Sequence, residues 1–277
     1  IGGTSGGNTP TEPEEPAAVA NSMNEDSCDP GQVLVDFECQ DIVECPEGFI
    51  LTPDNVCVTD PCEEIINLLN NTVYTDKVEE LNTIYKVNNT HERGYGIDKD
   101  GNPYSLPLSN DGHSLKLTGL NLDNIVGFVH THPCGKHDIG QGNSHTYIES
   151  IPMPSPSDIN EFKKLLLRAK NAGRNLQDIY MTVISCHGIF DLKYRGTGDN
   201  ISNWERKPGD ELFKQYFNEY KNPIVAMKKY LDEVVNMAGN DFELYEYTLN
   251  ETTDEYEVER QTVDGNGKDN FGIDDCN

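Results

Sequence analysis

Residues 125–133, IVGFVHTHP, end an apolar run with two histidines and a proline. The β-branched and aromatic content of the run predicts a buried central strand. Successive side chains of a strand point to opposite faces, so His130 and His132 are expected on the same face. Pro133 has no N–H for a β-ladder and is expected to end the strand. The stretch therefore predicts two imidazoles side by side at the end of a central strand.

A helix with a polar start is expected farther along the chain. Residues 152–160 read PMPSPSDIN and lead into apolar residues at helical spacing, which predicts a helix over residues 158–172 ended by Gly173. Two neutral imidazoles and one carboxylate are the ligands of a catalytic zinc site, whose fourth position stays open for water. The two histidines with Asp158 therefore predict a metal-dependent hydrolase.

The order His-Thr-His-Pro, then Pro-Ser-x-x-Asp, resembles the motif of the JAMM (MPN-plus) zinc metallopeptidases. The resemblance covers roughly residues 63–195, about half of the chain. It implies that His130, His132 and Asp158 bind Zn²⁺ and that Ser155 donates a hydrogen bond to the oxyanion of the tetrahedral intermediate. It also implies hydrolysis of amide or isopeptide bonds.

The family uses a glutamate on an upstream strand as its general base, and Glu92 is the best match. It precedes the predicted strand GYGID and lies 38 residues before His130 (130 − 92). Glu79 and Glu80 are less suitable, because the surrounding sequence TDKVEELNTIY has a helical pattern. The resemblance therefore assigns the base role to Glu92.

One departure from the family pattern concerns the loop before Ser155. The sequence has 22 residues between His132 and Ser155, more than is usual in the family. We expect this loop to lie beside the metal and to gate or shape the substrate cleft. Because it contains His137 and His145, the choice of metal-binding imidazoles stays open. Cys134 is a further alternative ligand, whose binding would oppose catalysis.

Each motif also has a purely structural interpretation. Two histidines on a strand are often polar-face residues without a ligand, and Glu92 is compatible with a solvated turn. The segment Ser-Pro-Ser-Asp is an ordinary helix start, in which Ser155 or Ser157 caps the helix and Glu161 completes a capping-box spacing from Asp158. We assign Ser157 the structural role and Ser155 the catalytic one.

The composition restricts the class of protein. The 277 residues are enough for one sizeable α/β domain with appendages. A formal charge of −27 disfavours binding to nucleic acids and to anionic membranes. No apolar run approaches the ~18–20 residues of a membrane span. The chain begins with Ile1 instead of Met, and we expect it to be the C-terminal part of a larger surface or secreted protein.

Five of the eight cysteines cluster in residues 28–62, and four of these five begin and end the half-repeats CDPGQVLVDFEC and CPEGFILTPDNVC. Such a short segment buries little core, so we expect disulfides to stabilise it, in an extracytoplasmic compartment. The simplest pairings are Cys28–Cys39 and Cys45–Cys57, although four cysteines have other connectivities. A structural zinc knuckle is the competing interpretation, but the Cys-x-x-Cys spacing is absent.

The remaining cysteines are far apart in sequence. A bond between Cys62 and Cys276 would tie the start of the catalytic domain to its tail and close a long loop. Cys134 follows His-Thr-His-Pro and Cys186 lies in MTVISCHG. These two would bridge if their strands are neighbours.

Composition also divides the chain into four parts. Residues 1–27 are rich in Gly, Thr, Pro and Glu and predict a flexible linker. Residues 28–62 form the disulfide-stapled segment. Residues 63–262 form the catalytic domain with a C-terminal helical extension, and residues 263–277 form a loop-like tail.

Helices alternate with strands in the catalytic domain. We predict two helices separated near Asn70–Asn71, then a hairpin that turns at Asp100-Gly101. Strands follow in DIYMTVISCHG and GIFDLKYRG, then two helices broken at Asn222-Pro223 and closed by Gly239, then a hairpin in ELYEYTLN and DEYEVERQTV. This order predicts an α/β fold. The resemblance implies a three-layer α/β/α sandwich around a mixed sheet, the deaminase-like JAMM/MPN fold.

The sequence thus predicts a secreted or cell-surface zinc metallopeptidase or isopeptidase acting on peptide or protein substrates. The alternative is a catalytically inactive extracellular interaction module that retains the fold. Water in the fourth coordination position would support catalysis, whereas a side chain from the long loop would indicate an inactive or structural site. A third possibility is that the histidines bind no metal.

Overall fold

The chain forms two compact units, Ile1–Val58 and Thr59–Asn277. The computed structural model describes residues 32–35, 38–41, 45–46, 49–51, 57–88, 90–108, 115–117, 119–133, 136–138, 147–149, 153–196, 198–199, 201, 206–219, 222–232, 242–250, 252–253, 255–263 and 271–276.

Short paired strands characterise the described part of the first unit. β1 (Gln32–Val35) is antiparallel to β2 (Glu38–Asp41), and β3 (Phe49–Leu51) pairs with β4 (Cys57–Thr59). A disulfide joins Cys45 to Cys57 with a Cα–Cα distance of 5.5 Å, which confirms the predicted pairing. The other predicted pair includes Cys28, which lies outside the described residues.

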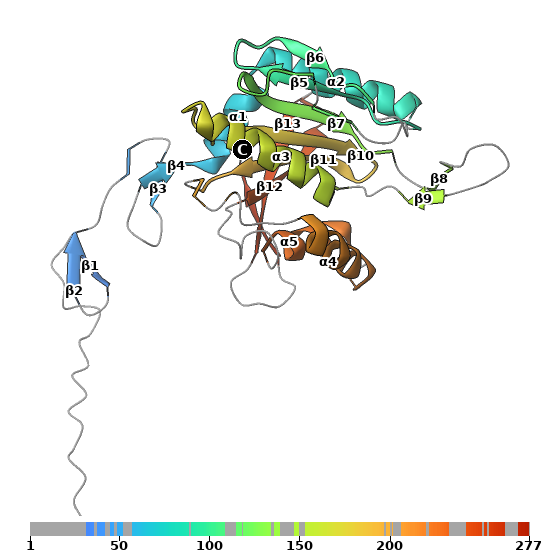
Figure 1. The fold of residues 1–277 in the computed structure, drawn as a ribbon. Helices are drawn as coiled ribbons and strands as arrows, with labels where there is room; N and C mark the ends of the chain where they lie inside the picture. The colour runs from blue at the N-terminus through green and yellow to red at the C-terminus, as the bar shows by residue number, and fades with distance from the viewer. Residues whose placement is uncertain are drawn as a thin grey trace, which may run out of the picture. The chain divides into compact units, whose positions relative to one another are not determined.

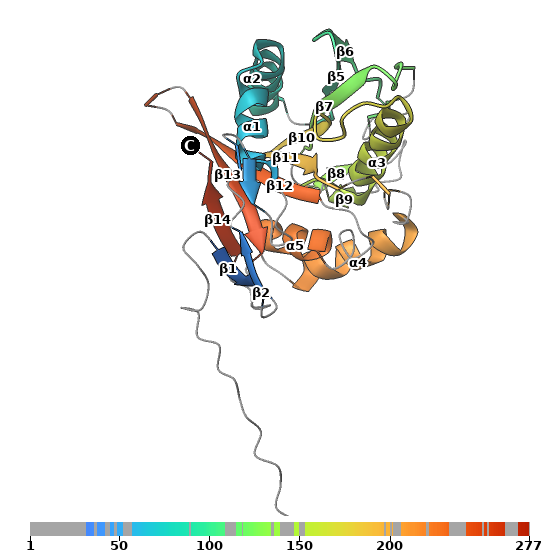
Figure 2. The ribbon, with the colours of Figure 1, turned by 90° about the vertical axis from the view of Figure 1, so that its left-hand side faces the viewer.

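The second unit is built on one mixed sheet (Figures 1 and 2). Its strands are β5 (Gly94–Asp98), β6 (Pro103–Ser105), β7 (Ile125–Thr131), β10 (Tyr180–Ser185), β11 (Gly188–Tyr194), β12 (Phe242–Asn250), β13 (Glu255–Val263) and β14 (Phe271–Asp275). In the part of the chain that the structure describes, their order is β14-β13-β12-β11-β10-β7-β5-β6. β7 and β10 are parallel, and the other neighbours are antiparallel.

β7 occupies an inner position, as its apolar sequence predicts. It lies between β5 and β10, and all its residues except Val126 are buried. The β5–β6 hairpin turns where predicted, with Gly101 at a φ of 81° that favours glycine. The end of β7 that carries the histidines is therefore held from both sides.

The helices begin and break close to where the sequence predicts. α1 (Pro61–Leu69) and α2 (Thr72–Val87) are separated at Asn71, whose side chain caps α2. α3 (Pro156–Asn171) ends just before Gly173, whose φ is 68°. Asn222 likewise separates α4 (Arg206–Glu219) from α5 (Pro223–Tyr230), whereas the predicted stop at Gly239 lies outside the described residues.

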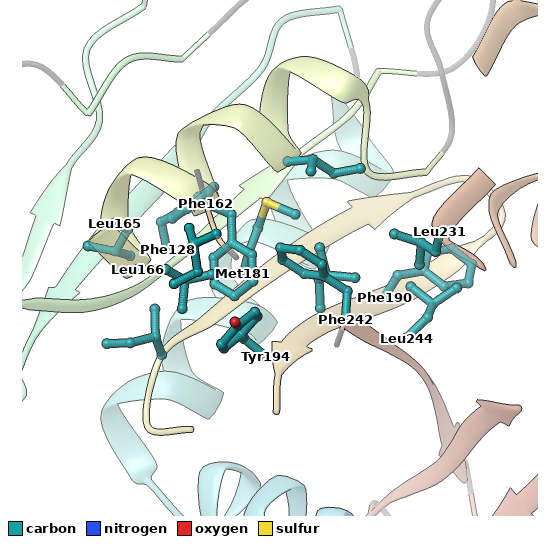
Figure 3. Close-up of a cluster of buried hydrophobic side chains, with 14 of the residues drawn as sticks. Phe128, Phe162, Leu165, Leu166, Met181, Phe190, Tyr194, Leu231, Phe242 and Leu244 are labelled. Carbon is teal, nitrogen blue, oxygen red and sulfur yellow. The ribbon is translucent and has the colours of Figure 1, made fainter. Parts of the chain in front are cut away.

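Helices pack on both faces of the sheet, and each face has its own hydrophobic cluster. Phe128 and Met181 belong to a cluster with residues of α3, α4 and α5 (Figure 3). Their chain neighbours Val129 and Tyr180 belong to a cluster with residues of α1 and α2. Because alternate strand residues point to opposite faces, the two clusters lie on opposite sides of the sheet, as Figure 2 shows for α2 and α3. The predicted α/β class is confirmed.

The C-terminal tail was expected to be a loop, and this expectation is wrong. Phe271–Asp275 form β14, which is antiparallel to β13. Cys276 is bonded to Cys62 across a sequence separation of 214 residues, which confirms that predicted pairing. The backbone ladder and the cross-link both attach the tail to the body of the unit. Cys186 is disulfide-bonded too, but Cys134 lies outside the described residues.

The long loop before Ser155 contains a short β-ladder. β8 (Lys136–Asp138) is antiparallel to β9 (Tyr147–Glu149). The side chains of His137 and His145, the alternative ligands, lie outside what the structure describes. Elsewhere in the described ranges, no helix has the length and apolar content to span a bilayer.

Candidate metal centre

The two histidines come from the end of β7. His130 is the register partner of Gly94 on β5 and of Val183 on β10. Beyond the strand, the His132 N–H still donates to the Ile184 carbonyl at 2.8 Å. The backbone of this corner is therefore fixed to both neighbouring strands. Both imidazoles are buried, with exposed fractions of 2 % for His130 and 4 % for His132.

The carboxylate comes from the first turn of α3. Ser155 caps this helix: its Oγ accepts from the Asp158 N–H at 3.3 Å, and its own N–H donates to Asp158 Oδ2 at 2.7 Å. The capping box thus joins Ser155 to Asp158, not Asp158 to Glu161, and the cap is Ser155 instead of Ser157. These two structural assignments are corrected. The reciprocal hydrogen bonds also orient the Asp158 carboxylate.

The three side chains converge on one point. His130 Nε2 lies 3.0 Å from His132 Nε2. Asp158 Oδ1 lies 3.3 Å from His130 Nε2, and Asp158 Oδ2 lies 3.1 Å from His132 Nε2. Among the described residues, this is the group whose ligand atoms all lie within 4.8 Å of one another. The structure therefore brings together the three predicted ligands.

These distances suit a shared metal ion. Tetrahedral ligands about 2.0–2.1 Å from Zn²⁺ lie about 3.3 Å from one another, close to the 3.0–3.3 Å observed here. The donor set of two nitrogens and one carboxylate also fits zinc with an open position. The residues present therefore fit a divalent metal ion such as the predicted zinc.

The electrostatics favour the protonation states that metal binding requires. Burial lowers the pKa of His130, against the opposing influence of Asp158. Burial alone would raise the pKa of Asp158, but His132 and His130 outweigh it and hold that pKa well below its usual range. A neutral imidazole and an ionised carboxylate are the forms that coordinate a cation.

Glu92 lies two residues before β5, the strand next to β7. The Thr131 N–H donates to the Arg93 carbonyl at 2.8 Å, so the β5–β7 ladder continues past Gly94. Strand alternation places Glu92, Gly94 and the facing His130 on one side of the sheet. Glu92 Oε2 accepts from the Leu115 N–H at 3.0 Å. Glu92 is near the centre but is not one of the grouped ligands.

Glycine at position 94 allows β5 to approach the histidines. A Cβ there would lie 2.8 Å from His130 Cβ, 2.6 Å from the Val129 carbonyl oxygen and 2.7 Å from Leu115 Cδ1. Separations below 3.0 Å require a neighbour to move, and one of these neighbours is backbone. The motif gave no direct signal for this role, although the glycines of GYGID mark a possible close approach.

Some residues near the centre had no sequence signal. A small cavity of about 10 Å³ is lined by His130 and Asp158 and by six further residues. These are Leu106, Leu115, Lys116, Leu117, Phe128 and Glu161. Leu106 and Leu115 reach the centre from the segment between β6 and β7, which carries no motif. Their contribution depends on tertiary packing.

A second buried polar group, the Asp191 cluster, comprises Asp191, Tyr74, Thr182 and Tyr247. Asp191 Oδ2 accepts from the hydroxyl groups of Tyr247 at 2.8 Å, Thr182 at 3.3 Å and Tyr74 at 3.4 Å. Burial raises the pKa of Asp191 to about 7, although these hydrogen bonds and Lys193 lower it. The cluster lies on the α2 face of the sheet, opposite the face that carries His130.

The geometry thus defines a buried group suited to a metal, with a glutamate just before the adjacent strand and a capped helix supplying the carboxylate. Comparison with known proteins adds no relative: the chain matches no protein-family model, no curated protein and no solved structure.

Proposed function

We propose that this chain is a zinc-dependent hydrolase of amide or isopeptide bonds in peptides or proteins. One observation carries the proposal: the ligand atoms of His130, His132 and Asp158 lie within 4.8 Å of one another in a largely buried site. Three such ligands leave a coordination position for a reactant, which is typical of catalytic zinc and not of structural zinc.

The order of motifs and the fold add support. Glutamate, then His-x-His-Pro, then Ser-x-x-Asp is the order of the JAMM (MPN-plus) family. A mixed sheet with helices on both faces is compatible with the three-layer α/β/α sandwich of that family. We extend the proposal to this fold and family.

Each polar residue has a role that its position supports. His130, His132 and Asp158 would hold the ion, and bound zinc would polarise the scissile carbonyl and make a water molecule more acidic. Glu92 takes the proton of the attacking water at its carboxylate and passes it to the leaving amine. The Ser155 hydroxyl accepts from the Asp158 N–H and still has its own proton to donate to the developing oxyanion.

The proposed setting is extracytoplasmic, either secreted or at the cell surface. The disulfides Cys45–Cys57 and Cys62–Cys276 are typical of oxidising compartments. The net charge of −27 opposes nucleic-acid binding. Peptides or proteins are therefore the proposed substrates.

The base role is tested with Glu92→Gln, which keeps the shape of the side chain but cannot take up the proton. We expect zinc-loaded Glu92→Gln to retain its zinc and to cleave peptide and isopeptide libraries at least about 100-fold more slowly than the wild type. Glu79→Gln, an exposed change on α2, is the matched control and should cleave at the wild-type rate.

Two results would contradict the proposal. Cleavage by Glu92→Gln at the wild-type rate would remove Glu92 from the mechanism. A zinc-loaded wild type that cleaves neither library would instead favour the non-catalytic interaction module.

A further inference from the structure

A cavity of about 310 Å³ lies between α2 and the β5–β6 hairpin, which are adjacent in Figure 1. Its apolar lining comes from Leu81 and Ile84 of α2 and from Leu106 and Leu108 after β6. Leu81 and Leu106 are buried, whereas Leu108 is 44 % exposed. The cavity thus has an apolar floor and an open rim, with a volume at the lower end of ligand sites.

This cavity adjoins the metal centre. Leu106 lines both this cavity and the small cavity that contains His130 and Asp158. Gly94 also lines it and is the register partner of His130. The proposed base, Glu92, forms another part of its wall. A molecule bound here would therefore lie next to Glu92, the proposed base.

The polar end of the cavity carries an unpaired guanidinium. Arg93 lines the cavity and is exposed, and its side chain has no hydrogen bond or ion pair with the described residues. Its backbone is held by Thr131 through hydrogen bonds of 2.8 and 3.0 Å. The chain has 48 acidic and 21 basic residues, so carboxylates for pairing are abundant. A planar guanidinium matches the geometry of a carboxylate.

We propose that this cavity binds the C-terminal residue of a peptide, with its apolar side chain on the leucine floor and its terminal carboxylate on Arg93. The volume suits a single residue, and only a terminal residue carries both an apolar side chain and a carboxylate. The proposal rests on the hydrolase function, because the amide bond before the bound residue would lie next to Glu92. Water would add across that C–N bond, leaving a carboxylate on the shortened peptide and transferring a proton to the released amine.

The test compares how tightly the full chain binds N-acetyl-leucyl-leucine and the C-terminal amide of the same peptide. Nuclear magnetic resonance titration measures both affinities. We expect the free acid to bind at least about tenfold more tightly than the amide, because only the acid forms the charge-assisted pair. Arg93→Gln should lower the affinity for the free acid to that for the amide and leave the affinity for the amide unchanged. Arg168→Gln, an exposed arginine on α3, is the matched control and should bind like the wild type.

Two further probes separate the parts of the proposal. N-acetyl-leucyl-glycine keeps the carboxylate without the side chain and should bind more weakly than the leucine peptide. N-acetyl-leucyl-glutamyl amide carries its carboxylate on a side chain, and binding as tight as that of the free acid would overturn the assignment to a chain terminus. Equal binding of acid and amide, or wild-type binding by Arg93→Gln, would overturn the role of Arg93.

Repeating the titration on chelator-treated protein separates peptide binding from the proposed zinc chemistry. A carboxylate also binds metal ions, so the Arg93 effect must persist in chelator-treated protein. If it persists while the zinc-loaded protein cleaves nothing, the binding site stands and the hydrolase function fails. If cleavage occurs without any preference for an apolar C-terminal residue, the hydrolase function stands and this site assignment fails.

Discussion

At the scale of single residues, Gly94 packs tightly against Val129 and His130 of β7. The absent Cβ leaves the space in which the His130 side chain lies. His130 in turn contributes an Nε2 atom 3.0 Å from that of His132. A small displacement at position 94 would therefore change the distances within the ligand group.

Gly94→Ala is expected to lower the free energy of unfolding by about 1–3 kcal/mol, because the added methyl must displace backbone or His130. We also expect weaker zinc binding. Urea denaturation and a zinc titration measure the two effects. Gly173→Ala is the control: its φ of 68° makes alanine unfavourable, but nothing lies within 4 Å of the added Cβ. It should lower stability without changing zinc affinity, and equal zinc affinity in both variants would contradict the account.

The sequence predicted the three ligands but not their geometry. Strand alternation is local, so His-Thr-His already places two imidazoles on one face. The approach of Asp158 depends on the packing of α3 through Ile159 and Phe162 against the sheet, which no local pattern encodes. The same holds for Leu115, whose N–H contacts Glu92 from a segment without a motif.

At the scale of elements, the start of α3 joins stability to the site. Ser155 supplies the cap, and its backbone N–H holds the Asp158 carboxylate at 2.7 Å. A change at Ser155 therefore affects the helix through its cap and, in the proposed mechanism, the reaction through its hydroxyl proton. Substitutions that separate these two effects are informative.

Ser155→Ala is expected to destabilise the chain by about 1 kcal/mol through loss of the cap, and Ser157→Ala by less. Ser155→Asn restores a side-chain cap but not the hydroxyl. We expect near wild-type stability in denaturant unfolding for Ser155→Asn, combined with slow hydrolysis of any substrate found. Wild-type turnover by Ser155→Asn would rule out the oxyanion role.

Some helices and strands could be predicted from local sequence signals, and others could not. Helical periodicity and the Asn-Pro and Asp-Gly signals located α1, α2, α5 and the β5–β6 turn. β14 was missed because FGIDD has only two apolar residues, Phe271 and Ile273, which are too few for a clear strand signal. β14 is held by its ladder with β13 and by the Cys62–Cys276 bond. Neither contact can be predicted from the local sequence of this segment. At the start of α3, two capping patterns overlap; the sequence interpretation gave the structural role to Ser157, whereas Ser155 is the cap.

At the scale of the whole molecule, the face of the sheet that packs on α1 and α2 carries buried charge. In GIFDLKY, Asp191 and Lys193 point to one face of the sheet, and Phe190, Leu192 and Tyr194 point to the other. A face with two charged residues would be expected to contact solvent. Both charged residues are nevertheless buried, at 0 % and 4 % exposure. The sequence predicted a strand here, but a local pattern cannot show that helices cover both of its faces.

Asp191 is expected to make stability depend on pH near neutrality. Its pKa of about 7 in the folded chain exceeds the value of about 3.9 in an unfolded chain. The folded state therefore binds the proton more tightly, and this contribution to stability is lost as pH rises through about 7. The full effect is on the order of 4 kcal/mol between pH 4 and pH 8.

The measurement is urea unfolding of the wild type and of Asp191→Asn from pH 5 to pH 8. The difference in unfolding free energy between the two should change with pH, with the wild type losing stability relative to Asp191→Asn as pH rises. His130, whose pKa is lowered by burial, acts in the opposite direction in both proteins and cancels in the difference. A constant difference would contradict the assignment.

The most direct test of the central claim is metal content by mass spectrometry of protein purified without chelator. The account predicts one zinc ion per chain in the wild type and in Glu92→Gln, and none in His132→Ala. A wild type without stoichiometric metal, or a His132→Ala variant that keeps its zinc, would contradict the claim that His130, His132 and Asp158 form a catalytic zinc site.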